Sequence, residues 1–393
     1  MSEWKEYKLG ELTLDGKGHY GIAAPAVDFD CSKYTYLRIT DINDDGTINR
    51  QGLKSVDDVK AKEYLLKPND IVFARTGASV GRSYFYDGKD GELVYAGFLI
   101  KFSLNPEKVC PYILKAYTHS QEYYDWIRAV DNGATRGNIN AQTFASMPIS
   151  LPSLDEQKRI AGVLSSLDDK IDLLNRENAT LEALAETLFR HYFIENPDPT
   201  WKEGTIADLI EFNPNRKLAK NEDSPYVEMA NIKTQGYAPS SWRMRPFAGG
   251  TKYINGDAIM ARISPCLENG KAAYIDFLEE KQVGWGSTEF IVMRSKIGLH
   301  PFFAYIMTRY DDFRDHAVSS LVGSSGRQRV DLDNLLKYSM LIPDEKAIAS
   351  FYREMEMIVP KMRNNQLQIQ TLATQRDTLL PRLMSGEVKV GEQ

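Results

Sequence analysis

Loops that carry arginine, serine, threonine and asparagine recur in both halves of the sequence, and such side chains suit contact with DNA. Arginine reads guanine with two hydrogen bonds, asparagine and glutamine read adenine, and hydroxyl groups hold phosphates. For any single residue a solvated turn or a structural ion pair is the ordinary interpretation, but recurrence at corresponding positions favours a binding surface. The candidate DNA-contact residues are Arg75, Thr76, Ser79, Arg82, Thr135, Arg136, Asn138, Arg243, Arg245, Arg262, Ser264, Ser324, Ser325, Arg327, Gln328 and Arg329.

Motifs for catalysis or metal binding are weak or missing. The segment Gly77 to Gly81 resembles a phosphate-binding loop, but its glycines are one residue too close together and Arg82 follows where lysine is needed. The five histidines are scattered and no HExxH occurs, so we expect no metal site. Asn213-Pro-Asn-Arg is not the Asn-Pro-Pro-aromatic signature of amino methyltransferases, and no glycine-rich cofactor loop accompanies it. We therefore expect no catalysis by this chain and no cofactor bound to it.

Composition and charge place broad limits on function. The 393 residues include 42% hydrophobic and 26% charged side chains, which argues against disorder and against a fibre. The net charge of −6 excludes coating of nucleic acid by bulk charge, so any DNA contact must come from local patches. Three widely separated cysteines suit a reducing compartment. No apolar run approaches the ~18 residues of a membrane span, so we expect a cytoplasmic protein that does not enter the membrane.

An internal repeat of roughly 190 residues organises the chain. Trp4-Lys5-Glu6 returns as Trp201-Lys202-Glu203. The segment that begins at Asp70 and ends at Arg75 returns at Asp257 to Arg262, an offset of 187 residues. A period this long indicates two domains in tandem rather than a solenoid.

Each repeat reads as a mixed domain followed by a long helix, so the expected fold class is α/β, of the α+β kind. Strand-length apolar runs occur at 70–74, 83–86 and 94–102, with glycines between them as turns. A helix is expected from Pro111 to Trp126, and its counterpart from Pro301 to Phe313.

Two long helices are expected at 153–195 and 344–384, because apolar residues recur there at alternating spacings of four and three. Ser153 followed by Glu156 predicts a capping box at the first helix. The apolar residues form one stripe along each helix, the seam, and Asn178 and Gln366 are polar residues within the two seams. Pro360 should kink or interrupt the second helix. The expected seams are Ile160, Leu164, Leu167, Ile171, Leu174, Asn178, Leu181 and Leu188, and Ile348, Met355, Val359, Met362, Gln366, Ile369 and Leu380.

These helices are too long to bury their seams inside a small domain, since forty helical residues span ~60 Å. Seams of equal length most simply pair with each other, as an antiparallel coiled coil within one chain. Pairing between two chains in a dimer is the alternative. The expected organisation is a target recognition domain at 1–152, a central helix at 153–195, a second recognition domain at 196–343, a C-terminal helix at 344–384 and a tail at 385–393.

Several motifs resemble those of the specificity subunits of type I restriction–modification enzymes. The block that begins at Pro148 and runs PISLPSLDEQKRIA resembles their central conserved region. Asp70-Ile-Val-Phe-Ala-Arg-Thr-Gly, Gly133-Ala-Thr-Arg-Gly-Asn-Ile-Asn and Leu380-Pro-Arg-Leu-Met-Ser-Gly-Glu also resemble that family. The resemblance covers essentially the whole chain, although the C-terminal copy lacks the Glu-Gln pair.

The resemblance implies a DNA-binding subunit without catalysis of its own. Each globular half would read one half of an asymmetric, bipartite double-stranded target, and the paired helices would set the spacer between the halves. Two modification subunits carrying S-adenosylmethionine would dock on this chain. Restriction subunits that use ATP and Mg²⁺ would join them. The alternatives are a non-catalytic adaptor that binds peptides and, less favoured, a DNA methyltransferase in its own right.

Overall fold

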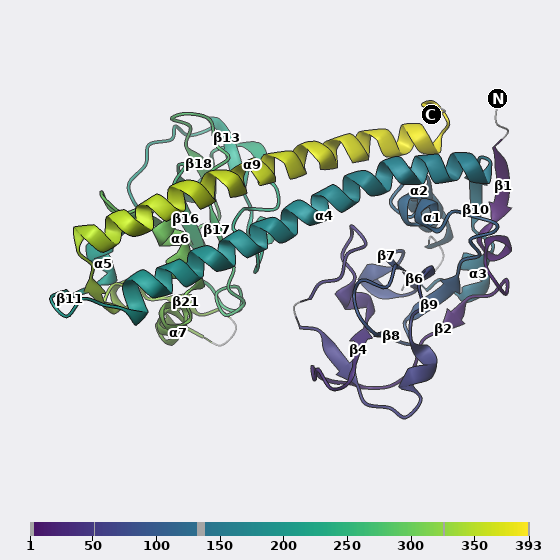
Figure 1. Cartoon of the computed structure of the whole chain (residues 1–393), viewed down its shortest axis with the longest axis horizontal. Helices are drawn as coiled ribbons and strands as arrows, with labels where there is room; N and C mark the ends of the chain where they lie inside the picture. The colour runs from purple at the N-terminus through teal and green to yellow at the C-terminus, as the bar shows by residue number, and fades with distance from the viewer. Residues whose placement is uncertain (1–3, 51, 132–137, 325–326, 392–393) are drawn as a thin grey trace. The chain divides into compact units, whose positions relative to one another are not determined.

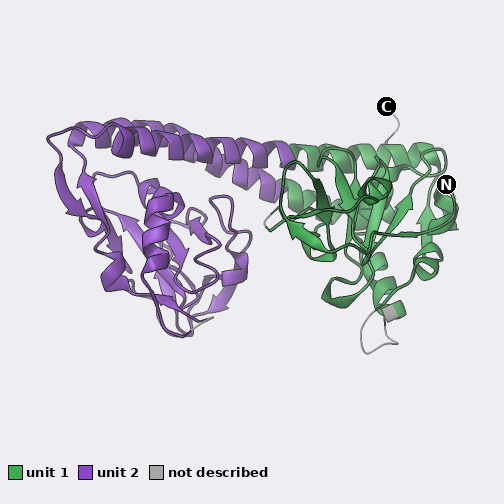
Figure 2. Cartoon of the chain, turned by 90° about the horizontal axis from the view of Figure 1, so that it is seen from below, with its two compact units in different colours: residues 1–170, 372–393 green, residues 171–371 purple. Residues whose placement is uncertain are grey.

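The chain divides into two compact units in the computed structural model, which describes residues 4–50, 52–131, 138–324 and 327–391. Unit 1 contains residues 1–170 and 372–393, and unit 2 contains residues 171–371 (Figure 2). Each unit therefore combines one globular half with parts of both long helices. This division differs from the expected one, which separates helices from globular domains.

The central sheet of unit 1 has the strand order β2–β9–β6–β7, with all pairs antiparallel. Its strands are β2 (His19–Tyr20), β6 (Asp70–Ala74), β7 (Ser83–Tyr86) and β9 (Leu99–Ser103). Every residue of β6 is buried, because this strand lies inside the sheet and both of its faces are covered.

A second sheet covers one face of this central sheet. Its order is β3–β5–β4–β8, and the pair β4·β8 is parallel. Leu37, Tyr95 and Leu93 of this sheet pack with Val72 and Leu99 of the central sheet. The strands are β3 (Ala26–Asp28), β4 (Tyr34–Leu37), β5 (Lys54–Val56) and β8 (Leu93–Tyr95), and short 3-10 helices lie at Leu9–Leu12, Ile39–Asp41, Ala61–Tyr64 and Gly77–Ser79.

Helices cover the other face of the central sheet of unit 1. The expected single helix at 111–126 is two helices, α1 (Pro111–Tyr117) and α2 (Gln121–Asp131), followed by α3 (Ala141–Ala145). Phe73 of β6 stacks on Phe144 of α3 at 4.8 Å between ring centroids, within the same apolar cluster as Ile113 and Ile127. Strand β1 (Lys5–Lys8) pairs with β10 (Pro148–Leu151), so the first and last strands of this half meet.

Unit 2 repeats this plan. The central sheet β12–β19–β16–β17 is covered by a second sheet, β14–β13–β18–β15, which again contains one parallel pair, and β11 pairs with β22. The expected helix at 301–313 is again two helices. The elements are β11 (Lys202–Thr205), α5 (Ile206–Leu209), β12 (Ile210–Phe212), β13 (Asp223–Val227), a 3-10 helix (Met229–Asn231), β14 (Arg243–Pro246), β15 (Thr251–Tyr253), β16 (Asp257–Ala261), β17 (Ala272–Tyr274), β18 (Gly284–Gly286), β19 (Phe290–Ser295), α6 (Phe302–Arg309), α7 (Asp311–Ser319), β20 (Leu321–Val322), β21 (Arg329–Val330), α8 (Leu332–Leu335) and β22 (Ser339–Ile342).

The aspartates that revealed the repeat have the same structural role in both units. Asp70 and Asp257 each open the central strand, and each accepts a hydrogen bond of 2.8 Å from the backbone nitrogen three residues earlier. Their charges are balanced by different partners: Lys101 for Asp70, and Arg216 with Arg294 for Asp257. Buried carboxylates need such partners, since an unpaired charge in the interior is costly.

The two long helices are α4 (Leu154–Arg190), which a single π-helical turn at His191–Glu195 extends, and α9 (Glu345–Met384) (Figure 1). The nitrogen of Glu156 lies 3.4 Å from the hydroxyl of Ser153, as the capping box predicts. Pro360 does not interrupt α9, which runs without a break from Glu345 to Met384; the kink stays a prediction. The proline side chain is exposed while the neighbouring Val359 and Met362 are buried, so packing on both sides of the proline holds the helix together.

The helices pair with each other, antiparallel, in both units. In unit 1 the early residues Ile160 and Leu164 of α4 share a core with Leu380 and Leu383 of α9. In unit 2 the later residue Asn178 donates a hydrogen bond to the carbonyl of Met362, at 3.4 Å. The expected coiled coil within one chain is therefore present.

The expected seam residues lie on the paired faces with graded burial, and at a few positions of α9 the neighbouring residue is the more buried one. The fully buried polar residue of α9 is Asn365, one position before the expected Gln366, and Phe351 and Ile358 are buried beside the expected positions. Buried seam residues are Ile160, Leu164, Leu174, Asn178, Met355, Val359, Met362 and Leu380, whereas Leu167, Ile171, Leu181, Leu188, Ile348, Gln366 and Ile369 are partly buried.

Candidate nucleic-acid interface

Each unit has one arginine directly after the central strand of its sheet, and the two arginines occupy equivalent places. Arg75 follows β6 and donates its backbone N–H to the carbonyl of Phe98 at 3.1 Å. Arg262 follows β16 and donates in the same way to Glu289 at 2.9 Å. The carbonyl of each arginine then accepts a hydrogen bond from a distant loop, from Ile139 at 2.9 Å and from Val330 at 2.8 Å. The fold thus joins the loops that the sequence analysis had identified separately.

In unit 1 this junction combines a cation, an amide and exposed aromatic rings. The Nε and Nη2 atoms of Arg75 donate to Oδ1 of Asn138 at 3.2 and 3.0 Å. The guanidinium also lies over the ring of Tyr20, 5.0 Å from its centroid. Tyr20 is 44% exposed and the neighbouring Phe98 is 60% exposed. Such a surface offers one fixed charge and apolar area for contact with bases.

In unit 2 the corresponding junction is dominated by arginines. Arg262, Arg327, Arg329 and Ser324 line an open hollow of about 550 Å³. Arg329 donates through Nε and Nη2 to both carboxylate oxygens of Glu289, at 2.6 to 3.1 Å. These hydrogen bonds, with the positive charge of Arg329, hold the pKa of Glu289 below its usual value. A concentration of cations in a hollow favours an anionic ligand.

The remaining candidates of the first half are less accessible or lie elsewhere. Arg82 forms an ion pair with Asp44 at 2.7 Å and donates to the carbonyl of Ile42, which is the structural interpretation considered above. Ser79 is buried, and Thr76 is partly buried in a β-bridge with Asn138. Thr135 and Arg136 lie outside the described residues.

Not all candidates of the second half lie at the junction. The backbone nitrogen of Ser264 donates to the carbonyl of Gln328 at 3.0 Å, so these two are part of it. Arg243 and Arg245 instead belong to β14 of the covering sheet, where Arg243 pairs with Glu228 and Arg245 lies 4.8 Å from the ring centroid of Tyr226. Ser325 lies outside the described residues.

Three further residues of the junctions are not among the candidates expected from the sequence: Tyr20, Phe98 and Glu289. Each is next to a predicted arginine only because of strand register. Tyr20 lies opposite Ile100 in β9, and the pairings Ala74 with Leu99 and Ala261 with Phe290 bring Phe98 and Glu289 opposite the two arginines. Aligning the two repeats at β9 and β19, which Phe98 and Glu289 directly precede, could have found these two residues.

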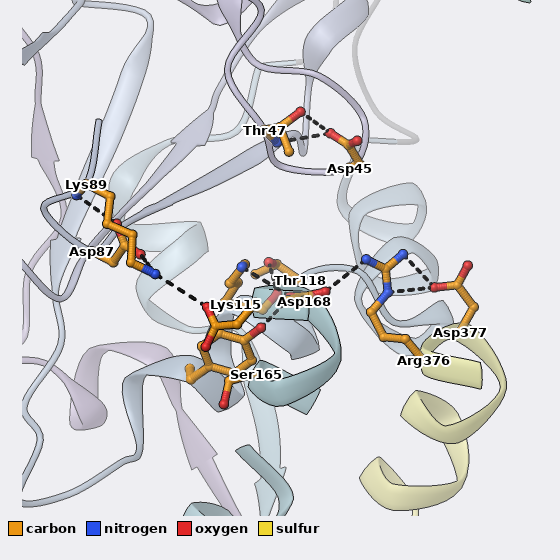
Figure 3. Close-up of polar contacts among 12 residues, drawn as sticks. Asp45, Thr47, Asp87, Lys89, Lys115, Thr118, Ser165, Asp168, Arg376 and Asp377 are labelled. Atoms are coloured by element: carbon orange, nitrogen blue, oxygen red, sulfur yellow. Dashed lines mark hydrogen bonds and ion pairs between the residues drawn. The ribbon is translucent and has the colours of Figure 1, made fainter. Parts of the chain in front are cut away.

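A cluster around Asp168 anchors the helices to the globular part of unit 1. Lys115 of α1 and Arg376 of α9 lie 3.2 and 3.0 Å from its carboxylate (Figure 3). Tyr112 also donates a hydrogen bond to it. Burial opposes ionisation, but the charge of Lys115, the hydrogen bonds and the charge of Arg376 outweigh it, so the pKa of Asp168 is lowered. This aspartate therefore stays charged and holds three elements together.

Unit 2 has a more deeply buried anchor at Glu182 of α4. Tyr305 donates a hydrogen bond to this carboxylate, and Arg309 lies 3.5 Å from it. The guanidinium of Arg309 also donates to the backbone carbonyls of Thr234, Gly236 and Gly270 at 2.8 to 3.0 Å. Burial raises the pKa of Glu182 despite these partners. One arginine thus links α4, α6 and two loops.

In the described part of the chain, no group of three or more histidine, cysteine, aspartate or glutamate residues could hold a metal ion. No described helix is long and apolar enough to cross a membrane.

Several known proteins similar to this chain are specificity subunits of type I restriction enzymes. Residues 1–183 match the family described as the type I restriction modification DNA specificity domain. The HindI specificity subunit of Haemophilus influenzae is 21% identical over 99% of this chain and 100% of its own length. The MjaIX specificity subunit of Methanocaldococcus jannaschii is 25% identical over 72% of this chain and 69% of its own length.

A solved structure shares the fold. The crystal structure of the S subunit of a type I restriction–modification system from M. genitalium covers 100% of this chain and 97% of its own, with a TM-score of 0.54 and 15% identity. At this identity the similarity concerns the fold alone. The family match over residues 1–183, the curated relatives and the shared fold all point in one direction: this chain is similar to the specificity subunits of type I restriction–modification enzymes.

Proposed function

We propose that this chain is the sequence-specific DNA-binding subunit of a type I restriction–modification complex. Each globular half reads one half of a bipartite double-stranded target. The observation that carries this proposal is the repeated junction, in which Arg75 and Arg262 end equivalent strands and meet equivalent distant loops. Two such surfaces in one chain match the two half-sites of a bipartite target.

The two half-sites should differ. The junction of unit 1 presents Tyr20, Phe98 and Arg75, whereas that of unit 2 presents three arginines and Glu289. Base edges are distinguished by hydrogen-bond pattern and by the thymine methyl group, so surfaces with different chemistry select different bases. An asymmetric target follows from this difference.

The paired helices set the spacer between the half-sites and provide a docking surface for two modification subunits. Binding of both half-sites by one molecule raises the effective concentration of the second domain only when the spacing matches. In this proposal the chain catalyses nothing. S-adenosylmethionine, ATP and Mg²⁺ act on the modification and restriction subunits, and the complex works on DNA in the cytoplasm.

Sequencing of methylated adenines tests this function. The chain is produced together with its cognate modification subunits in a host that lacks other adenine methyltransferases. We expect one bipartite motif with two unlike halves, and no methylation when either component is omitted. Methylation by the chain alone would instead identify it as a methyltransferase. The absence of any sequence preference in the complete complex would favour an adaptor.

A further inference from the structure

The residues at the two junctions can be matched one to one by their backbone hydrogen bonds. The carbonyls of Arg75 and Arg262 accept from Ile139 and Val330, so the preceding residues, Asn138 and Arg329, are equivalent. Each of these two also forms a β-bridge with the residue after the strand-end arginine, Thr76 or Ile263. Phe98 is likewise equivalent to Glu289, because the backbone carbonyl of each accepts a hydrogen bond from the backbone nitrogen of the strand-end arginine.

This correspondence shows the same pairing of an arginine with an acceptor in both units. The segments that supply the arginine and the acceptor are exchanged between the units. In unit 1 the strand end supplies the arginine, Arg75, and the loop supplies the acceptor, Asn138. In unit 2 the loop supplies the arginine, Arg329, and the strand side supplies the acceptor, Glu289. In both units the acceptor is bound by Nε and Nη2 of the guanidinium.

When Nε and Nη2 of an arginine donate to an acceptor, the opposite edge of the planar guanidinium can still bind another group. A guanidinium carries five N–H donors in a fixed plane. The edge formed by Nη1 and the second hydrogen of Nη2 can then approach N7 and O6 of guanine, the commonest specific contact in the major groove. Arg75 and Arg329 are both partly accessible to solvent, with Arg329 having a side chain that is 49% exposed.

We propose that Arg75 and Arg329 are the guanine-reading residues of the two halves, and that Asn138 and Glu289 are positioning residues that orient them. This proposal rests on the proposed function and goes beyond it by assigning a base and a residue to each half. Tyr20 adds a second constraint in unit 1, because its ring lies against the guanidinium of Arg75. Each half-site therefore contains a guanine whose recognition depends on one arginine.

The test uses the complete modification complex and compares methylation of DNA libraries by the wild-type chain and by Arg75→Lys and Arg329→Lys. Lysine keeps the charge but loses the planar fork. We expect the preference for one guanine to fall roughly 5- to 150-fold in one half-site only, with the other half-site unchanged. The two variants should affect opposite halves. Arg50→Lys, which alters an exposed arginine that is paired with Asp90 and lies outside both junctions and both long helices, is the matched control and should change neither half.

The positioning role needs a readout that a loss of folding would not produce. Glu289→Ala should lower the same guanine preference as Arg329→Lys, and the double variant should be no worse than Arg329→Lys alone. Glu289→Gln, which keeps a hydrogen-bond acceptor, should restore part of the preference. Additive losses, or equal weakening at every base of the target, would contradict positioning.

Failure of this inference is distinguishable from failure of the proposed function. If the wild-type complex yields a bipartite motif but both lysine variants keep every guanine preference, the assignment is wrong and the function stands. A motif in which either half lacks guanine also overturns the assignment. If the wild-type complex yields no motif, the proposed function itself fails.

Discussion

The helix pair is anchored differently in the two units, although both units share one fold. In unit 1 the anchor is Asp168, which is partly exposed and paired with Lys115 and Arg376. In unit 2 the anchor is the buried Glu182, which interacts with Arg309 and Tyr305. An apolar cluster that includes Phe193 and, from α6, Phe303 lies next to it. A repeated fold therefore preserves the position of its helices without preserving the interactions that fix them. The buried anchor should be the more sensitive to substitution, because loss of one partner leaves uncompensated polar groups in the interior.

The largest effect is expected from Arg309→Met. This substitution leaves Glu182 buried without its cation and leaves the carbonyls of Thr234, Gly236 and Gly270 without their shared donor. We expect the free energy of unfolding to fall by ~3–5 kcal/mol. Urea unfolding, combined with hydrogen exchange of the peptide that contains α6, measures this change.

The matched control in unit 1 is Arg376→Met. Its guanidinium is partly exposed and Asp168 keeps Lys115 as a second cation, so we expect a loss of no more than about 1 kcal/mol. Equal losses for the two variants would show that the depth of burial does not distinguish the anchors.

We expect acidic pH to lower the folding stability of unit 2, because His300 is buried in its neutral form. Burial lowers the pKa of this imidazole to about 4, against a smaller opposing effect of Glu356, whose carboxylate lies 3.5 Å away. Because the folded pKa lies below the ordinary 6.5, the unfolded chain takes up the proton first as pH falls. The contribution of neutral His300 to the free energy of unfolding is complete above about pH 6.5. It is lost as the pH falls towards 4, by up to about 3 kcal/mol. Asp168 in unit 1 has a lowered carboxyl pKa, so its contribution is lost only at more acidic pH.

The variant His300→Asn isolates this effect. The amide oxygen can still accept the hydrogen bond that Nδ1 receives from the nitrogen of Phe302 at 3.1 Å, but it does not titrate. Urea unfolding at pH 7.5 and pH 5 should show a smaller acid loss in the variant than in the wild type. Burial raises the pKa of Asp276 to about 6, which acts in the opposite direction, so the two proteins must be compared at each pH. Identical acid losses would exclude His300 as the cause.

A smaller effect than that of Arg309→Met is expected in the polar layer of the helix pair in unit 2. Asn365 donates 2.9 Å hydrogen bonds to Asn178 and to Glu177. Asn365→Leu leaves the buried amide of Asn178 with fewer partners and should cost about 1–2 kcal/mol in unfolding free energy. The double variant with Asn178→Leu should recover this loss or exceed wild-type stability, because both polar groups are then gone. Thermal unfolding of the three proteins checks the order, and a double variant weaker than Asn365→Leu would contradict it.

The fold could be predicted from the sequence where one physical pattern dominates. The segments around Asp70 and Asp257 recur because a buried strand start needs the same carboxylate, and the long helices carry apolar residues at regular spacing. At a few positions of α9 the residue next to the expected one is buried, because adjacent residues compete for the seam. Phe351 and Tyr352, and Asn365 and Gln366, fit equally well until packing against the globular part selects one of each pair.

The candidate site could be predicted only in part, for a related reason. Arg75 and Arg262 stand out because the repeat places them at strand ends. Their neighbours depend on pairing between distant segments, which local sequence does not specify. Glu289 is adjacent to Arg329 only through the register of β16 and β19 and the loop that meets them, and Arg82 has its ion pair with Asp44 for a similar reason.

The division of unit 1 between the two ends of the chain has a consequence for biosynthesis. Ile160 and Leu164 are synthesised well before their partners Leu380 and Leu383, which belong to the segment 372–393 of the same unit. At 5–20 residues per second the ribosome needs about 10–40 s to cover the intervening stretch. During that time the apolar stripe of the nascent chain lacks its partner residues. Chaperones must shield it, or it stays loosely packed until residues 372–393 have been synthesised.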